Sequence, residues 1–303
     1  MSASRSEEPP DRTGPVDAAG GDPLGDQGRS SEERMPEDRP LDDGVIDLWL
    51  SYYDDAADAS LAAAMRALLT DDERAQEPRF YFADDRRRYL VTRALVRTVL
   101  SRYAPLAPEA WRFAKNDYGR PEIAPDILIA HPQAADLRFN VSHTRGLIAL
   151  AVVRGREIGV DVEHLRVRAV SLGIADRFFA PDEVVALAQV PEHAQQERFF
   201  EYWTFKESYI KARGMGLSLP LDGFSFHYPR DDAVRIAIRD DLSDVPERWR
   251  FWQCRPTEDY LLALCAERRD GPAPVVRMRR VVPLSSDSVV TAAFTRRSDD
   301  DAD

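Results

Sequence analysis

The sequence predicts an α+β fold built from two similar α/β subdomains, a pseudo-dimer in which each half packs an antiparallel sheet on one long helix. Each half contains one segment of helical length with apolar residues at helical spacing, 86–103 in the first and 195–213 in the second. Each half also contains short apolar or alternating segments of strand length, separated by turn residues. A cleft between two such halves is a common place for a ligand.

The expected elements of the first half rest on alternation for strands and on helical spacing for helices. They are a strand at 45–49, helices at 56–69 and 86–103, an extended segment at 111–113, a turn at 118–121, and strands at 137–141, 147–153 and 157–163. In the second half, Pro181 begins a helix because proline is tolerated in the first helical turn. The remaining predicted elements are a helix at 195–213 and strands at 224–226, 234–238, 249–254 and 260–266.

Composition separates the two ends from a folded body. Residues 1–44 contain twelve acidic and five basic side chains with six Gly and six Pro, which predicts a disordered acidic arm. Residues 284–303 contain five acidic and two basic side chains, and we predict a disordered acidic tail there. The subdomains then span 45–156 and 157–283. Since most of the formal net charge of −12 lies in the two ends, the acidic balance does not exclude an anionic ligand of the body.

Several classes of protein are disfavoured. The chain has no apolar run near the ~18 residues of a membrane span and no apolar centre of a signal peptide in its first forty residues, so we expect a cytoplasmic protein away from membranes. Basic residues are not interleaved with aromatic ones, which argues against nucleic acid. Cys254 and Cys265 are isolated in apolar strands and are predicted to be reduced packing residues.

Three carboxylates and a lysine form the main candidate site. The strand period of two places Asp161 and Glu163 on one face of their strand, where they suit Mg²⁺, although a solvated acidic edge strand gives the same pattern. On the helix, Glu207 and Lys211 share a face, and the alternative is an exposed ion pair. A carboxylate beside ammonium groups on one helical turn suits a metal and a phosphate together.

Lysine is rare in this chain. Only Lys115, Lys206 and Lys211 occur among forty-one basic residues, and two of them lie in one short stretch. Where arginine is used almost everywhere, a retained lysine indicates a position that needs a compact ammonium. Chance clustering is the competing interpretation.

Further candidate anion donors lie at turns and helix starts. Ser142 and His143 end a strand and could donate to phosphate oxygens, although a lone histidine is more often a packing or surface residue. Arg120, between Gly119 and Pro121, could hold a bidentate anion or be an ordinary exposed turn arginine. The cluster 86–88 could reach another phosphate or be solvated. The chain contains no P-loop or G-x-G-x-x-G motif, so a phosphate site would be made of side chains.

In this order the motifs resemble the 4′-phosphopantetheinyl transferases of the Sfp type. The segments that carry the resemblance span about residues 45–283, and six of them occur in the family's order. The segments are Arg88 and the six motifs Tyr118-Gly-Arg-Pro121, Phe139-Asn-Val-Ser-His-Thr144, Ile158-Gly-Val-Asp-Val-Glu163, Arg177-Phe-Phe179, Trp203-Thr-Phe-Lys-Glu-Ser-Tyr-Ile-Lys211 and Gly216-Leu-Ser-Leu-Pro-Leu221.

The resemblance implies a monomeric, Mg²⁺-dependent transferase of the holo-[acyl-carrier-protein] synthase type. It would move 4′-phosphopantetheine from coenzyme A, bound between the halves, to a serine of an apo acyl or peptidyl carrier protein of polyketide, nonribosomal peptide or fatty acid synthesis. Asp161, Glu163 and Glu207 would hold Mg²⁺, with Asp161, Glu207 and Lys211 as catalytic residues and Glu207 as the candidate base. The residues implied in coenzyme A binding are Arg88, Tyr118, Gly119, Arg120, Pro121, Ser142, His143, Lys206 and Lys211.

Two positions depart from the family pattern, and two other functions remain open. Arg120 stands where lysine is frequent and Thr144 where serine is common, and both keep a hydrogen-bond donor. A noncatalytic coenzyme A-binding or carrier-docking protein would not need the three metal carboxylates, whereas a Mg²⁺-dependent phosphohydrolase would use the same ones. Arg166 and Arg168 could dock an acidic carrier or be a solvated face. Residues 214–221 could supply apolar contact to the carrier or be a buried loop.

Overall fold

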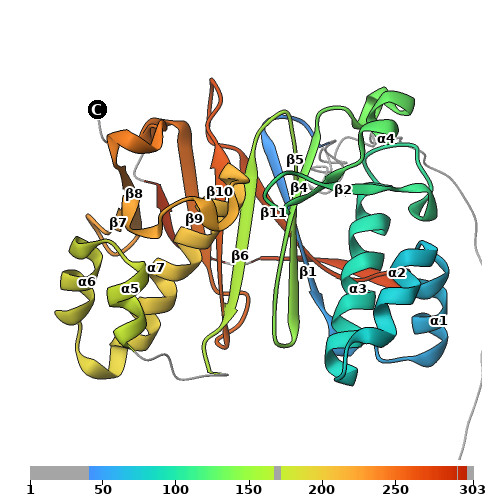
Figure 1. The fold of residues 1–303 in the computed structure, drawn as a ribbon, viewed down its shortest axis with the longest axis horizontal. Coiled ribbons are helices and arrows are strands. Elements are labelled where there is room, and N and C mark those ends of the chain that lie inside the picture. Colours follow the sequence, from blue (N-terminus) through green and yellow to red (C-terminus); the bar gives the residue numbers. More distant parts are fainter. Residues whose placement is uncertain (1–40, 167–171, 292, 299–303) are drawn as a thin grey trace, which may run out of the picture. The chain divides into compact units, whose positions relative to one another are not determined.

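Two sheets lie back to back in the computed structural model, which describes residues 41–166, 172–291 and 293–298 (Figure 1). The predicted acidic arm lies outside the described residues except for 41–44, of which Leu41 packs in a core. Pro40–Asp303 forms one unit, and the predicted α+β class with two similar halves is confirmed.

The first sheet has the strand order β12-β11-β1-β5-β4. Within it β1 pairs antiparallel with β5 but parallel with β11, so the sheet is mixed where an antiparallel one was predicted. Its strands are β1 Val45–Tyr52, β4 Leu137–Thr144, β5 Leu147–Arg154, β11 Val275–Val282 and β12 Ser286–Val290. A separate hairpin pairs β2 Phe113–Lys115 with β3 Pro121–Ile123.

The second sheet has the order β6-β10-β9-β13-β8-β7. It too is antiparallel apart from one pair, β13 with β8. Its strands are β6 Ile158–His164, β7 Phe224–His227, β8 Ala233–Ile238, β9 Trp249–Cys254, β10 Tyr260–Glu267 and β13 Phe294–Ser298.

Helices cover the outer faces of the two sheets, α3 on the first and α7 on the second (Figure 1). Helix α7 ends at Gly214, whose left-handed φ of 67° suits glycine at a helix C-terminus. The α-helices are α1 Ala59–Ala67, α2 Asp71–Gln76, α3 Ala83–Leu100, α4 Pro125–Ala130, α5 Ala175–Phe178, α6 Pro181–Ala188 and α7 Glu192–Arg213.

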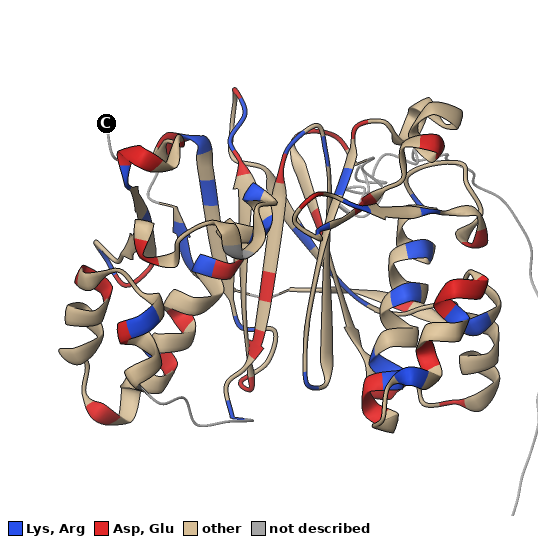
Figure 2. Cartoon of the chain, in the orientation of Figure 1, with Lys and Arg blue, Asp and Glu red and all other residues tan. Residues whose placement is uncertain are grey.

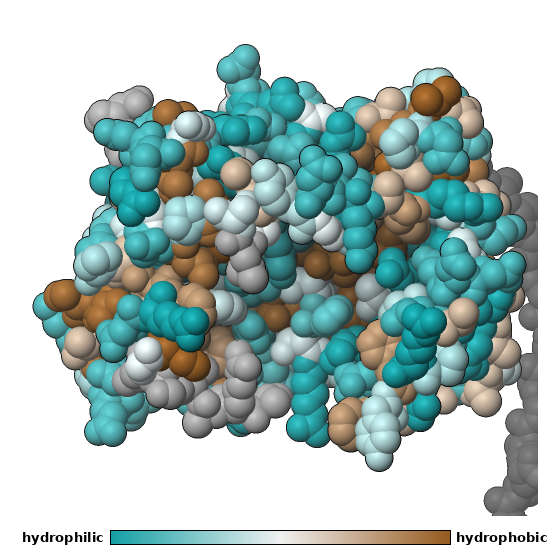
Figure 3. Space-filling view, in the orientation of Figure 1, coloured by the Kyte–Doolittle hydropathy of each residue, from teal (hydrophilic) through white to brown (hydrophobic). Residues whose placement is uncertain are grey.

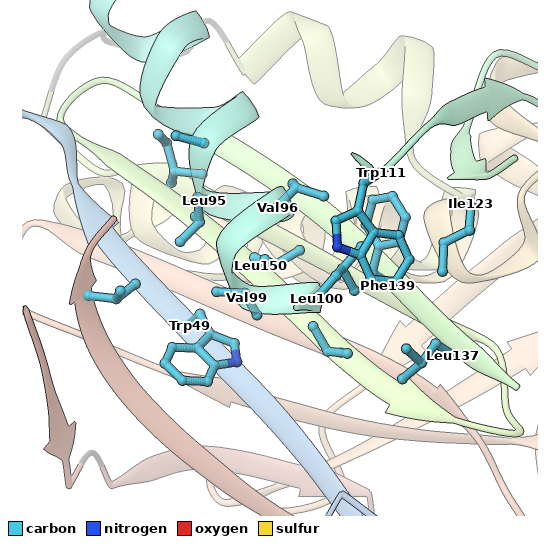
Figure 4. Packing of buried hydrophobic residues seen from close by; sticks show 14 of the residues in the cluster. Trp49, Leu95, Val96, Val99, Leu100, Trp111, Ile123, Leu137, Phe139 and Leu150 are labelled. Atoms are coloured by element: carbon cyan, nitrogen blue, oxygen red, sulfur yellow. The ribbon is translucent and has the colours of Figure 1, made fainter. Parts of the chain in front are cut away.

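Three apolar cores hold these layers together. In the first, Leu95 and Val99 of α3 pack on Trp49 and Leu150 of the sheet (Figure 4). A second core lies between α7 and its sheet, and a third fills the space between the two sheets. Strand β5 contributes to both the first and the third core, which explains why its sequence is a continuous apolar run rather than an alternating one.

The prediction of a disordered tail over 284–303 is wrong for β12 and β13. Strand β13 lies between β9 and β8 inside the second sheet, although its sequence is polar. Arg296 of β13 is buried there and reaches Glu201 of α7 at 2.8 Å and the side-chain oxygen of Gln253 at 3.1 Å. The predicted second subdomain, 157–283, is also wrong for the sheets, since β11 lies within that range but pairs with β1 in the first sheet.

Both cysteines lie in strands of the second sheet. Cys254 and Cys265 are free and buried in β9 and β10, as expected of packing residues. Burial raises the pKa of both thiols. No helix among the described residues is long and apolar enough to cross a membrane.

Replacing Asp287 of β12 tests how firmly this strand belongs to the fold. Its carboxylate accepts hydrogen bonds from Arg102 at 2.9 Å and Arg279 at 2.8 Å, and the bond from Arg102 is the main reason that its pKa is lowered. Asp287→Asn should therefore cost about 1 kcal/mol of unfolding free energy at pH 7, measured by urea denaturation.

The same variant has a defined pH dependence. A depressed folded-state pKa stabilises the protein above the ordinary aspartate pKa of about 3.9, and this stabilisation is lost as the pH falls through the folded value. The difference between wild type and Asp287→Asn should shrink in that acid range. The exposed Asp270→Asn is the control. Equal stability of wild type and Asp287→Asn at pH 7 would contradict the assignment of β12.

Candidate active site

A glycine sets the distance between strand β6 and helix α7. A Cβ atom at Gly159 would lie 1.9 Å from the carbonyl oxygen of Ser208 and 2.5 Å from the amide nitrogen of Ala212. Only glycine allows the helix backbone to come this close to the strand. The close contact brings the α7 face that carries Glu207 and Lys211 over the acidic face of β6.

The strand presents its carboxylates to the helix, as the period of two predicts. Val160 and Val162 point into the core between the sheets. Asp161 and Glu163 therefore lie on the opposite face, toward α7. Figure 2 shows these acidic positions on β6 and the basic positions on α3.

Asp161 and Lys211 form the centre of the site. The Lys211 ammonium donates to Asp161 Oδ1 at 2.6 Å and to Ser142 Oγ at 2.9 Å, and the Ser142 hydroxyl donates to the same Asp161 oxygen at 3.0 Å. Asp161 is 5% exposed. Its other oxygen, Oδ2, is buried without a hydrogen-bond partner among the described residues. A buried carboxylate oxygen without a hydrogen-bond partner is energetically costly unless a ligand contacts it.

Glu207 is crowded by the neighbouring carboxylate. Burial raises the pKa of Glu207, the negative charge of Asp161 raises it further, and Lys211 opposes both. Within the described part of the chain, no three His, Cys, Asp or Glu side chains are arranged to hold a metal ion. The oxygen donors Asp161, Glu163 and Glu207 nevertheless match what Mg²⁺ prefers, and the unpartnered Oδ2 of Asp161 fits a cation.

Asp161, Glu163 and Lys211 form one wall of a pocket of about 460 Å³ between the halves, whereas Glu207 is not among the residues that line it. Arg88 of α3 lines it and pairs with Asp85 at 2.7 Å. His143 lines it as well; burial, followed by the positive charge of Arg88, lowers the pKa of His143. A lowered pKa favours the neutral imidazole, which offers one N–H donor. Other lining residues include Phe80, Tyr89, Thr92, Arg93, Pro121, Val141 and Ser142. Figure 3 shows that the face of the molecule in view is largely hydrophilic, with scattered apolar patches.

The prediction that Lys206 binds coenzyme A phosphates is wrong in this structure. Lys206 is 0% exposed, and its ammonium donates to the carbonyl oxygens of Leu221 at 2.8 Å and Phe224 at 2.6 Å and pairs with Glu183 at 2.7 Å. Successive helix residues are about 100° apart, so Lys206 points into the second core while its neighbour Glu207 faces β6.

Arg120 also differs from the prediction. Of the predicted turn, Pro121 lines both the pocket described above and a second cavity beside it, and Arg120 and Glu157 line only the second cavity. Arg120 Nη1 donates to Glu157 Oε2 at 2.9 Å and to the carbonyl oxygen of Ala212 at 3.1 Å. Tyr118 is exposed, and Gly119 has a φ of 88° that the turn requires.

Two residues that matter for the geometry of the site, Asn140 and Glu183, were not predicted from the sequence as individual functional residues. Asn140 of β4 accepts a hydrogen bond from the Val160 amide at 2.9 Å, and with Ser142 it links β4 of one sheet to β6 of the other. The signal was the spacing of Asn140 and Ser142 by two, which places both on one strand face. Glu183, the buried partner of Lys206, gave no such signal, because it reads as an ordinary acidic residue in the first turn of α6.

Of the two arginines predicted to dock a carrier protein, the structure describes one. Arg166 is exposed and pairs with Asp259 at 3.0 Å, while Arg168 lies outside the described residues. In the segment 214–221, Leu219 is buried and Ser218 is exposed, so the segment is buried only in part.

Two family models and several curated relatives match this chain. The family model described as "4'-phosphopantetheinyl transferase superfamily" matches residues 157–265, and the one described as "4'-phosphopantetheinyl transferase, N-terminal" matches residues 55–154. Among curated relatives, the 4'-phosphopantetheinyl transferase Sfp of Bacillus subtilis (strain 168) is 35% identical over 69% of this chain and 87% of its own length. The 4'-phosphopantetheinyl transferase HetI of Nostoc is 38% identical over 51% of this chain and 63% of its own length.

The chain belongs to the 4'-phosphopantetheinyl transferase superfamily. The predicted likeness to the Sfp type is therefore confirmed.

The buried lysine can be tested through stability. Lys206→Met should lower the free energy of unfolding by about 3–5 kcal/mol, because it leaves the Glu183 carboxylate buried without its cation. Chemical denaturation measures the change, and the exposed Lys115→Met is the matched control. The double variant Lys206→Met/Glu183→Gln should recover part of the loss. A Lys206→Met protein as stable as Lys115→Met would refute the structural role.

Proposed function

We propose that this protein transfers the 4′-phosphopantetheine group of coenzyme A to a serine hydroxyl of an apo acyl or peptidyl carrier protein, releasing adenosine 3′,5′-bisphosphate. The observation that carries the proposal is the meeting of the Asp161 carboxylate and the Lys211 ammonium in a pocket that Arg88 and His143 also line. Cationic and neutral donors beside carboxylates suit a substrate that is both phosphorylated and metal-bound.

Asp161, Glu163 and Glu207 would hold Mg²⁺. When bound, the ion would neutralise charge on the pyrophosphate and polarise the attacked phosphorus. The Asp161 oxygen that lacks a partner is the position with most to gain from a cation.

Lys211 would stabilise the departing group. Its side chain is 25% exposed and lines the pocket, and its ammonium already donates to Ser142 and Asp161. The ion pair fixes the ammonium in place before the substrate arrives, which is the arrangement that favours electrostatic stabilisation of a transition state.

Glu207 would take the proton of the carrier serine, directly or through water. In this step a bond forms between the serine oxygen and the phosphorus that carries pantetheine. The bond from that phosphorus to the bridging oxygen of the pyrophosphate breaks, and adenosine 3′,5′-bisphosphate leaves with the negative charge. Because serine is a poor nucleophile, a positioned base is needed.

The decisive experiment incubates the protein with coenzyme A, Mg²⁺ and a panel of apo carrier domains. Intact mass should show a gain of ~340 Da for one phosphopantetheine on the carrier, the product that this reaction class requires. Release of free phosphopantetheine without a gain would instead identify a phosphohydrolase. Bound coenzyme A with no product would identify a binding protein.

A substitution of Glu207 tests its role in the chemical step. Glu207→Gln should lower kcat by about 100-fold or more while changing coenzyme A affinity far less, since it removes a base and a metal ligand but none of the basic groups of the pocket. Steady-state kinetics and calorimetric titration of coenzyme A measure the two quantities. Glu192→Gln, at the exposed start of the same helix, is the control. Equal losses in kcat and affinity would exclude Glu207 as the base.

A further inference from the structure

The turn that precedes β3 contacts the last turn of α7. Asn116 Nδ2 donates to the carbonyl oxygen of Gly214 at 2.9 Å, and Arg120 Nη1 donates to that of Ala212 at 3.1 Å. The same Arg120 nitrogen pairs with Glu157 Oε2 at 2.9 Å. We call this set, Asn116, Arg120 and Glu157 with the carbonyls of Ala212 and Gly214, the clasp.

The clasp satisfies a general need of helix ends. The last four carbonyl groups of a helix have no partner within it, and the C-terminal end carries partial negative charge. Here an amide and a guanidinium from the first half of the chain supply donors to the end of a helix in the second half. The contact is close: a Cβ atom at Gly214 would lie 3.2 Å from Arg120 Nη1.

Arg120 Nη1 bonds two protein partners, whereas Arg120 Nε is buried without a hydrogen-bond partner among the described residues. Its side chain is 9% exposed, and the cavity that it lines also contains Glu157, Leu137 and Phe139 rather than Ser142, His143 and Lys211. Both contacts, to Glu157 and to Ala212, are made by the single nitrogen Nη1.

We propose that Arg120 and Glu157 are positioning residues that hold the last turn of α7 against the first half, and that they do not bind the ligand's phosphates. Ala212, which Arg120 contacts, directly follows Lys211 in the chain, and Lys211 reaches Ser142 on the first half. Loosening the clasp shifts the Lys211 ammonium away from Ser142 and Asp161. The kinetic part of this proposal rests on the proposed transferase function; the stability part does not.

A kinetic experiment compares coenzyme A with 3′-dephospho-coenzyme A as substrates for Arg120→Met, Arg120→Lys and Glu157→Gln. If the clasp positions Lys211, kcat falls about tenfold or more in Arg120→Met, by a similar factor for both substrates, because small displacements in an active site are costly. Glu157→Gln shows the same pattern more weakly, and the ratio of the two KM values stays as in wild type.

The alternative, in which Arg120 binds the ligand, gives a different kinetic result. If Arg120 binds the 3′-phosphate, Arg120→Met removes the preference for coenzyme A over its dephospho form and Glu157→Gln leaves kinetics unchanged, which overturns the proposal. Arg138→Met is the matched control, because Arg138 lines the same cavity but donates to the first-half carbonyls of Ala135 and Leu137. It should keep wild-type kinetics.

A second experiment measures the stability of the protein and does not require it to be an active enzyme. In a double-mutant cycle by chemical denaturation, Arg120→Met and Glu157→Gln together should lower the unfolding midpoint by less than the sum of the single changes, since both remove one contact. Additive shifts overturn the clasp. Calorimetric titration of adenosine 3′,5′-bisphosphate is a further test. If Arg120→Met alone among the variants binds this ligand more than tenfold more weakly than wild type does, the proposal is overturned. If wild type is inactive on every carrier, the transferase proposal fails while the cycle still decides the clasp.

Discussion

The close packing of α7 on β6 at Gly159 is the constraint on which the site depends. At this residue the helix backbone occupies the space that any side chain would need. The helix is thereby held at one height above the strand, and Glu207 and Lys211 come over the carboxylate of Asp161. Since Ser142 belongs to the other sheet, the same contact also fixes the position of the helix relative to the first half.

Both halves are needed because the pocket is built across the seam between two sheets. Side chains rather than a backbone ladder join β4 to β6, with Asn140 bonded to Val160 and Ser142 bonded to Asp161. A buried hydroxyl and a buried amide are costly unless they are hydrogen-bonded, so these pairings also specify the register between the halves. The acidic cluster is tolerated because Lys211 neutralises part of its charge.

Periodicity predicted which residues share a face, and that was sufficient for much of the site. The period of two placed Asp161 with Glu163, and the helical spacing placed Glu207 with Lys211. Periodicity says nothing about what covers a face, which is why the buried position of Lys206 was not foreseen. Strand β13 was not predicted for a related reason: its polar sequence resembles a tail, and the partners of Arg296, Glu201 and Gln253, lie far away in the sequence.

The retained lysines have a physical explanation that differs between the two positions. At Lys206 three acceptors, two carbonyls and the Glu183 carboxylate, surround one nitrogen, an arrangement that suits the three diverging donors of an ammonium better than a planar fork. At Lys211 a single small charge is shared by Ser142 and Asp161 at the pocket wall, with one donor left over. Arg120 likewise bonds a carboxylate and a carbonyl oxygen, through the single nitrogen Nη1. A shared preference for lysine within one motif does not imply a shared role, because Lys206 is enclosed by acceptors in the core whereas Lys211 lies at the pocket wall.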